Sequence, residues 1–113
     1  MVKILIVEDN FFLKKALEEK LSNFSDIVIK DTAQNGEEAI AILEKNHVVD
    51  LILMDIEMPI MNGIKATEII KSNYPQIKII MITVFDNDDN VFNAIKAGAD
   101  GYLLKETKAE KIY

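Results

Sequence analysis

The stretch Leu51-Ile52-Leu53-Met54-Asp55 joins four consecutive apolar side chains to one carboxylate. A strand that is apolar at every position is buried on both faces, which is typical of the centre of a parallel sheet covered by helices. Ligands of such sheets bind beyond the carboxyl ends of the strands. We therefore predict a central strand here, with Asp55 at the edge of the sheet where a ligand would bind.

Strand-like and helix-like segments alternate along the rest of the chain. This alternation on short connections predicts an α/β fold with a doubly wound, five-stranded parallel sheet. We expect the flavodoxin-like strand order 2-1-3-4-5, with the first and fifth helices on one face and the other three on the opposite face. Strands are predicted at residues 2–7, 27–31, 49–55, 77–83 and 100–104. Helices are predicted at residues 11–22, from Asn35-Gly36 to about Lys45, from Asn62-Gly63 to about Asn73, between Asn90 and Gly98, and from Glu106 onward.

The first predicted helix has a capping residue and an apolar periodicity. Asn10 stands where a helix-capping side chain belongs. Phe12, Ala16, Leu17 and Leu21 recur near the 3.6-residue period of a helix. These four residues are therefore expected to form the face that packs on the sheet.

Composition predicts one globular domain over residues 1–113, because the chain has 113 residues and half of them are apolar. The net charge of −6 and the lack of a basic patch argue against direct nucleic-acid binding by this segment. The chain has no cysteine, and its single His47 is expected in a solvated loop. No signal peptide and no run of bilayer length are visible, so we expect a cytoplasmic domain that does not contact a membrane.

The last predicted helix has room for only about two turns before Tyr113. We interpret it as truncated, and the chain as a fragment of a longer protein. Part of the sheet face over the fourth and fifth strands would then be exposed, and a bare apolar face favours association.

Polar side chains end four of the predicted strands. They are Glu8 and Asp9, Asp55, Thr83 and Lys105. In a parallel sheet these positions meet at one edge. Carboxylates in close proximity repel one another, and Mg²⁺, which prefers oxygen ligands, would relieve that repulsion. Singly, each residue has an ordinary role as a cap, a turn residue or a loop lysine; together they fit an aspartate that accepts a phosphoryl group.

The chain also resembles the receiver domains of two-component response regulators over its whole length. The motifs that carry the resemblance are Val7-Glu8-Asp9-Asn10, Leu53-Met54-Asp55-Ile56-Glu57-Met58-Pro59, Met61-Asn62-Gly63, Ile82-Thr83 and Gly101-Tyr102-Leu103-Leu104-Lys105.

The resemblance implies a role for each matching residue. Asp55 would be the phosphoacceptor. The Mg²⁺ ligands would be the side chains of Asp9 and Asp55 and the backbone carbonyl of Glu57, with Glu8 acting through water. Thr83 and Lys105 would bind the phosphoryl group, and Thr83 and Tyr102 would form a switch pair.

The resemblance also implies a partner and an output. A sensor histidine kinase would donate the phosphoryl group, and the domain would not be an enzyme that turns over an external substrate. The motif ending in Lys105 is most similar to receivers linked to helix-turn-helix outputs of the LuxR/NarL type, which points to transcription regulation. In the family the surface of strand four, helix four, strand five and helix five often forms the dimer or output interface, so we expect a homodimer through that surface. Glu106 follows Lys105 where many receivers have proline, so no cis peptide is expected there.

Three other functions remain open from the residues alone. A Mg²⁺-dependent hydrolase or phosphatase would need a general acid or base near Asp55, and the matching position is Glu57, whose side chain is expected to point outward. A flavin-binding module would need a phosphate loop after the first strand, where Glu8-Asp9-Asn10 is acidic. A phosphorylation-independent interaction module would not require the complete set of strand-end groups.

Overall fold

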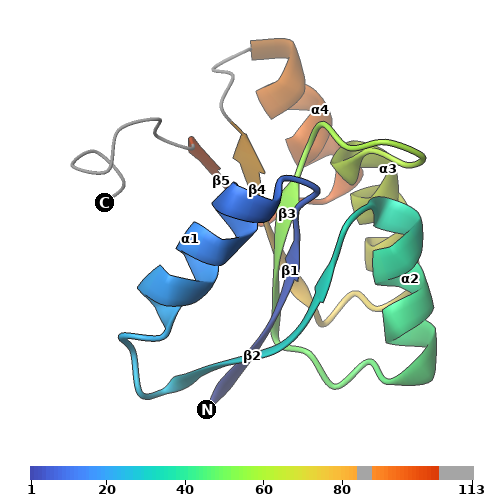
Figure 1. Cartoon of the computed structure of the whole chain (residues 1–113). Coiled ribbons are helices and arrows are strands. Elements are labelled where there is room, and N and C mark those ends of the chain that lie inside the picture. Colours follow the sequence, from blue (N-terminus) through green and yellow to red (C-terminus); the bar gives the residue numbers. More distant parts are fainter. Residues whose placement is uncertain (84–87, 105–113) are drawn as a thin grey trace.

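A five-stranded parallel sheet forms the centre of the molecule in a computed structural model that describes residues 1–83 and 88–104 (Figure 1). The strand order is β2-β1-β3-β4-β5, as predicted. The strands are β1 (Val2–Val7), β2 (Ile27–Ala33), β3 (Leu51–Asp55), β4 (Lys78–Thr83) and β5 (Gly101–Leu104). The described helices are α1 (Phe11–Leu21), α2 (Gly36–Lys45), α3 (Gly63–Asn73) and α4 (Asp88–Ala97).

Strand ends differ from the prediction by one or two residues. β2 continues to Ala33 because its last residues pair with β1 through Val7. β3 begins at Leu51, although Val49 is buried. The amide of Val49 donates to the His47 carbonyl at 2.9 Å, within the preceding loop. The apolar pattern correctly indicates that Val49 is buried, but pairing with the neighbouring strands begins only at Leu51.

The helices divide the hydrophobic core into two layers. Figure 1 shows α1 on one face of the sheet and α2, α3 and α4 on the other. The core under α2, α3 and α4 includes Leu5, Val7, Ala39, Leu43, Ile52, Met54, Ala66, Ile70, Ile79, Met81 and Ala94. The smaller core under α1 is formed by Ile4, Ile6, Leu53 and Ile82, with Leu17 and Leu21 packed against it. The predicted division of the first four helices is confirmed; the predicted last helix lies outside the described residues.

The predicted apolar face of the first helix is only partly correct. Leu17 and Leu21 pack on the sheet, but Phe12 is 79% exposed and Ala16 is also exposed. None of the residues of α1 is fully buried. Phe12 lies in the first turn of α1, and the side chains of this helix that pack on the sheet, Leu17 and Leu21, lie further along it.

Three helices begin with the same asparagine cap. The side chains of Asn10, Asn35 and Asn62 accept hydrogen bonds from amides three residues further on, at 3.1, 2.8 and 2.9 Å. Such caps satisfy helix amides that have no partner within the helix. Gly98 follows α4 with a φ of +110°, a conformation that glycine adopts without strain.

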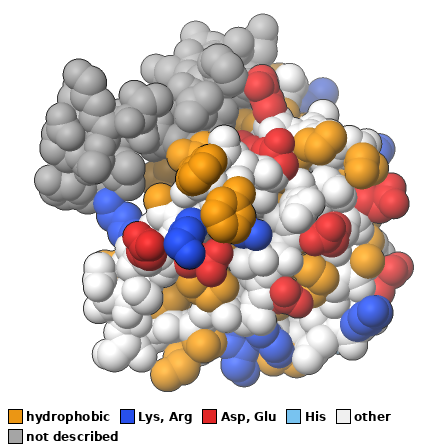
Figure 2. Space-filling view, viewed as in Figure 1, with side chains coloured by type: hydrophobic (Ala, Val, Ile, Leu, Met, Phe, Trp, Pro, Cys, Tyr) orange, Lys and Arg blue, Asp and Glu red, His pale blue; other side chains and the backbone are white. Residues whose placement is uncertain are grey.

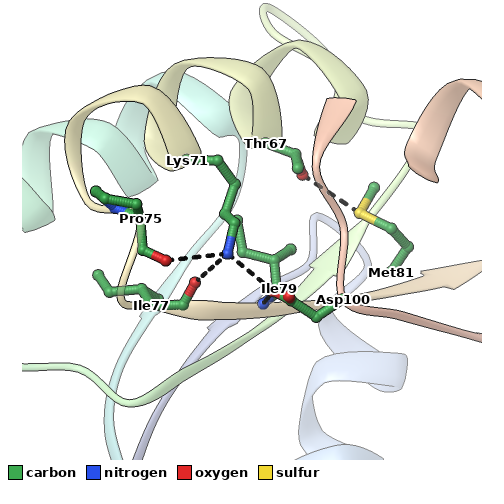
Figure 3. Close-up of polar contacts among 7 residues, drawn as sticks. All are labelled: Thr67, Lys71, Pro75, Ile77, Ile79, Met81 and Asp100. Atoms are coloured by element: carbon green, nitrogen blue, oxygen red, sulfur yellow. Dashed lines mark hydrogen bonds and ion pairs between the residues drawn. The ribbon is translucent and has the colours of Figure 1, made fainter. Parts of the chain in front are cut away.

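A polar brace, formed by Lys71 and Asp100, holds the amino-terminal ends of β4 and β5 against α3 (Figure 3). The Lys71 ammonium donates to Asp100 at 3.0 Å, to the Ile77 carbonyl at 3.0 Å and to the Pro75 carbonyl at 3.3 Å. The Ile79 amide donates to the same Asp100 oxygen at 2.9 Å. The brace therefore connects one helix and two strands.

The predictions for the end of the chain fall outside the described residues, whereas the prediction about membrane-spanning helices can be compared with the structure. The peptide bond between Lys105 and Glu106 lies outside the described residues, and so does the extent of the last helix. Among the helices that the structure describes, none has the length and hydropathy needed to cross a bilayer.

Candidate functional site

Glu8, Asp9 and Asp55 form an acidic cluster at the carboxyl edge of the sheet. Glu8 and Asp9 directly follow β1, and Asp55 is the last residue of β3. β1 and β3 are neighbouring strands, with Val7 paired to Met54. One carboxylate oxygen from each of the three residues lies within 4.8 Å of the other two. The predicted meeting of these three side chains is confirmed.

Burial differs between the three carboxylates. Glu8 is 1% exposed and Asp55 is 5% exposed, whereas Asp9 faces solvent. The Asn10 amide donates to Glu8 Oε2 at 3.1 Å, which orients that carboxylate, and the Glu8 amide donates to the Ala33 carbonyl at 2.9 Å. Two buried oxygen donors beside an exposed one suit a hard divalent cation that keeps part of its hydration.

Glu57 lies in the loop after β3, and its side chain is exposed. The outward position that was expected for this side chain is confirmed. A carboxylate in that position faces solvent, so it does not provide a buried general acid beside Asp55.

Two of the remaining predicted site residues, Thr83 and Tyr102, lie on the neighbouring strands β4 and β5. Thr83 ends β4, and its backbone pairs with Leu104. Tyr102 is half-buried, pairs with Met81 and packs against the core under α3 and α4. The backbone of Thr83 therefore lies one diagonal step from that of Tyr102. Lys105 lies outside the described residues.

The loop between β3 and α3 contains two features that the sequence reasoning missed. Ile60 has a φ of +67°, which is rare for a β-branched residue, and its side chain is 77% exposed. Gly63 packs directly on the backbone of Asp55. In the sequence, Asn62-Gly63 indicates only a turn and a helix start, so the close contact with Asp55 has no local signal.

An exposed aromatic pair follows the acidic cluster in the chain. Phe11 is 60% exposed and Phe12 is 79% exposed, and their rings meet edge to face with centroids 5.8 Å apart. The ammonium groups of Lys14 and Lys15 lie 5.8 and 5.9 Å from the Phe11 ring. Figure 2 shows hydrophobic and basic side chains together over the beginning of α1. Exposed aromatic area of this kind is typical of contact surfaces for other proteins.

His47 packs against an aromatic ring and is not part of the acidic cluster. It is exposed in the loop before β3, and its ring stacks on Tyr74 with centroids 5.2 Å apart. The expected position in a solvated loop is confirmed.

Comparison with known proteins gives a consistent match. The family model described as response regulator receiver domain matches residues 4–113. The response regulator protein VraR of Staphylococcus aureus is 42% identical over 113 residues, which cover 98% of this chain and 53% of VraR. The chain therefore spans about half the length of this curated relative.

Solved structures show the same fold. A DNA-binding response regulator of the LuxR family from Staphylococcus aureus superposes with a TM-score of 0.87 at 28% identity, covering 98% of this chain and 92% of that one. The CheX–CheY–BeF3–Mg²⁺ complex from Borrelia burgdorferi contains a chain with a TM-score of 0.88 at 28% identity, covering 98% of this chain and 83% of that one.

Proposed function

The chain belongs to the family of response regulator receiver domains, and on that basis we propose that Asp55 accepts a phosphoryl group from a sensor histidine kinase. The observation that carries the proposal is the acidic cluster, in which Asp55 is buried beside Glu8 and Asp9 with carboxylate oxygens within 4.8 Å of one another. A buried aspartate beside two further carboxylates suits a signalling domain that accepts a phosphoryl group. The exposure of Glu57 disfavours the alternative of a hydrolase that turns over an external substrate.

The acidic cluster fits Mg²⁺, which would be held by the side chains of Asp9 and Asp55 and by the backbone carbonyl of Glu57. Glu8 would contribute through a water molecule, as in the family, and one of its oxygens also accepts from the Asn10 amide. When bound, the ion neutralises charge on the phosphoryl oxygens. An Asp55 carboxylate oxygen would attack phosphorus in line, and the bond to the donor's leaving group would break as the new P–O bond forms.

Thr83, Lys105 and Tyr102 complete the proposed mechanism. Thr83 and Lys105 would bind the phosphoryl oxygens, and the Thr83 hydroxyl would move toward them. Tyr102 would turn inward behind Thr83, which its half-buried place beside Met81 allows. Phosphorylation would then favour one of two arrangements of β4 and β5, because only one of them binds the new group well.

The partners follow from the same proposal. The exposed pair Phe11 and Phe12, beside the acidic cluster in the chain, supports docking of a protein phosphodonor. The similarity to VraR and to a LuxR-family regulator supports a DNA-binding output in transcription regulation. A kinase that donates to a transcriptional regulator would act on this domain in the cytoplasm, and that is the location that we propose. Phe92 and Ile95, which are 66% and 62% exposed on α4, support a homodimer through the surface of β4, α4, β5 and the predicted last helix.

The proposal is tested by the intact mass of the chain after incubation with acetyl phosphate, with and without Mg²⁺. We expect a phosphoryl adduct that requires Mg²⁺ and is absent in Asp55→Asn. Asp50→Asn is the matched control, because Asp50 is an exposed aspartate just before β3, and it should retain the adduct. An adduct that persists in Asp55→Asn would disprove the assignment of the acceptor.

A further inference from the structure

Two helices of the chain begin with the same dipeptide. Asn35-Gly36 opens α2 and Asn62-Gly63 opens α3, and both asparagines cap their helix with the side chain. Both glycines are buried. The two helix starts therefore share their sequence and cap, and they differ in what each glycine contacts.

Gly63 is in contact with the backbone of Asp55. A Cβ atom at position 63 would overlap the Asp55 carbonyl oxygen and would lie 2.9 Å from both the Asp55 carbonyl carbon and Met54 Cγ. Such distances are shorter than real Cβ contacts. The Gly63 amide also donates to the Ile56 carbonyl at 2.8 Å. The first turn of α3 thus packs directly against the backbone of Asp55 and Ile56. No space for a side chain remains between Gly63 and Asp55.

We propose that Gly63 is a positioning residue for Asp55, an inference that rests on the proposed phosphoacceptor function. By allowing α3 to touch the Asp55 backbone, Gly63 sets the depth of the Asp55 carboxylate in the acidic cluster. A methyl group at position 63 has a backbone oxygen as its nearest neighbour, and backbone cannot rotate away as a flexible side chain can. The first turn of α3 or the end of β3 must therefore shift, and a shift of β3 moves Asp55 relative to Glu8 and Asp9, which follow β1.

The acidic cluster is sensitive to such a shift. Mg²⁺ requires nearly ideal octahedral geometry with oxygen ligands at about 2.0–2.1 Å. Site geometry has to hold within about 0.5 Å for full function. Displacing Asp55 relative to Asp9 therefore weakens Mg²⁺ binding even when all carboxylates are retained.

Gly36 is the matched control. A Cβ atom there would lie 2.7 Å from Ala66 Cβ, 2.9 Å from the Met61 carbonyl oxygen and 3.0 Å from Met61 Cγ. The crowding at Gly36 thus involves α3 and the loop before it, and Asp55 is not among its nearest neighbours. Gly36→Ala introduces the same methyl group at the same position of a helix, and it reports the general cost of overpacking.

The experiment compares Gly63→Ala with Gly36→Ala in the full chain, using calorimetric titration with Mg²⁺ and the amide resonance of Asp55 without metal. We expect Gly63→Ala to weaken Mg²⁺ binding about tenfold or more, as supporting residues of metal sites do. It should also shift the Asp55 resonance, whereas Gly36→Ala, whose nearest neighbours are Ala66 and Met61, should change both clearly less. Folded Gly63→Ala with wild-type Mg²⁺ affinity would overturn the inference.

A second pair of variants tests the inference if Gly63→Ala does not fold. Asn62→Ala and Asn35→Ala each remove one exposed helix cap, whose hydrogen bonds measure 2.9 and 2.8 Å. Fraying of the first turn of α3 would weaken the contact between Gly63 and the Asp55 backbone. Asn62→Ala should therefore weaken Mg²⁺ binding a few-fold more than Asn35→Ala. Equal Mg²⁺ affinities in the two variants would contradict the inference.

Failure of the inference and failure of the proposed function are distinguishable. Wild-type protein that binds Mg²⁺ but gains no adduct from acetyl phosphate would contradict the acceptor role, whatever the glycine variants do. Wild-type protein that gains the adduct, with glycine variants of equal Mg²⁺ affinity, would retain the acceptor role and reject the role of Gly63.

Discussion

Ile60 is held in a backbone conformation that suits few residues of its kind. Its φ of +67° places a β-branched side chain in the left-handed region, and the side chain is 77% exposed. The amide of Met61 donates to the Pro59 carbonyl at 2.7 Å, which closes a tight turn around Ile60. The turn therefore imposes strain at a residue that gains little from burial.

We predict that Ile60→Gly stabilises the chain. Left-handed backbone costs an L-residue about 1–2 kcal/mol, whereas the extra freedom of glycine in the unfolded chain costs about 0.5–1 kcal/mol. The net gain should be about 0.5–1 kcal/mol in the free energy of unfolding, measured with urea. Val48→Gly is the control, because Val48 is 51% exposed and is not among the positive-φ residues, so this change should destabilise. A loss of stability in Ile60→Gly would show that the conformation carries no strain.

At the scale of elements, the polar brace joins α3 to the starts of β4 and β5. Burial acts to raise the pKa of Asp100, but the hydrogen bond from the Ile79 amide, the hydrogen bond and charge of Lys71 and the charge of Lys78 outweigh it. The pKa of Asp100 in the folded state therefore lies below its ordinary value of 3.8. A group with a depressed folded pKa stabilises the protein above its unfolded pKa, and this contribution is lost as the pH falls through the folded pKa.

We predict that Asp100→Asn destabilises the chain at neutral pH and that this difference disappears in acid. The Asp100 side chain is 33% exposed, so solvent screening limits the loss at pH 7 to about 1 kcal/mol. The difference from wild type should shrink as the pH falls below 3.8, the ordinary pKa.

Urea unfolding of both proteins between neutral pH and about pH 3 measures this difference across the window in which the carboxylate titrates. Glu68→Gln is the control, since Glu68 pairs with Lys65 on an exposed surface where both side chains are more than half exposed. It should leave stability nearly unchanged at every pH. A difference between Asp100→Asn and wild type that stays constant with pH would exclude titration of Asp100 as its cause.

At the scale of the whole molecule, β4 and β5 lie between the acidic cluster and the outer surface of α4. β5 is an edge strand, and β4 lies between it and β3, which carries Asp55. Phe92 and Ile95 expose apolar area on α4. A change that starts at Asp55 would therefore have two strands to cross to reach this surface, and this path would couple the proposed phosphorylation to the proposed dimer.

We predict that the phosphorylated chain forms a dimer that Ile95→Glu weakens by about tenfold or more, because a carboxylate would be buried in an apolar contact. Sedimentation velocity with acetyl phosphate and Mg²⁺ measures the dissociation constant. Phe24→Glu is the control, since Phe24 is 54% exposed in the turn after α1, away from α4. Equal effects of the two variants would argue against this surface.

Much of the fold could be predicted because apolar pattern and capping residues act locally. The alternation of strands and helices followed from periodicity, and the starts of α2 and α3 followed from Asn35-Gly36 and Asn62-Gly63. Phe12 was placed wrongly because periodicity shows which residues share a helix face, and not how much of that face the sheet covers. Val49 was assigned to a strand because burial and pairing leave the same apolar pattern.

The sequence by itself determined the doubly wound sheet and the side chains that meet at its edge. Parallel strands bring their carboxyl ends together, so Glu8, Asp9 and Asp55 had to lie near one another once the strands were assigned. The tertiary structure alone decided how deeply each carboxylate is buried, the strained turn at Ile60 and the contact of Gly63 with Asp55. These features depend on how a helix approaches a strand in three dimensions, and no local pattern of residues encodes that distance.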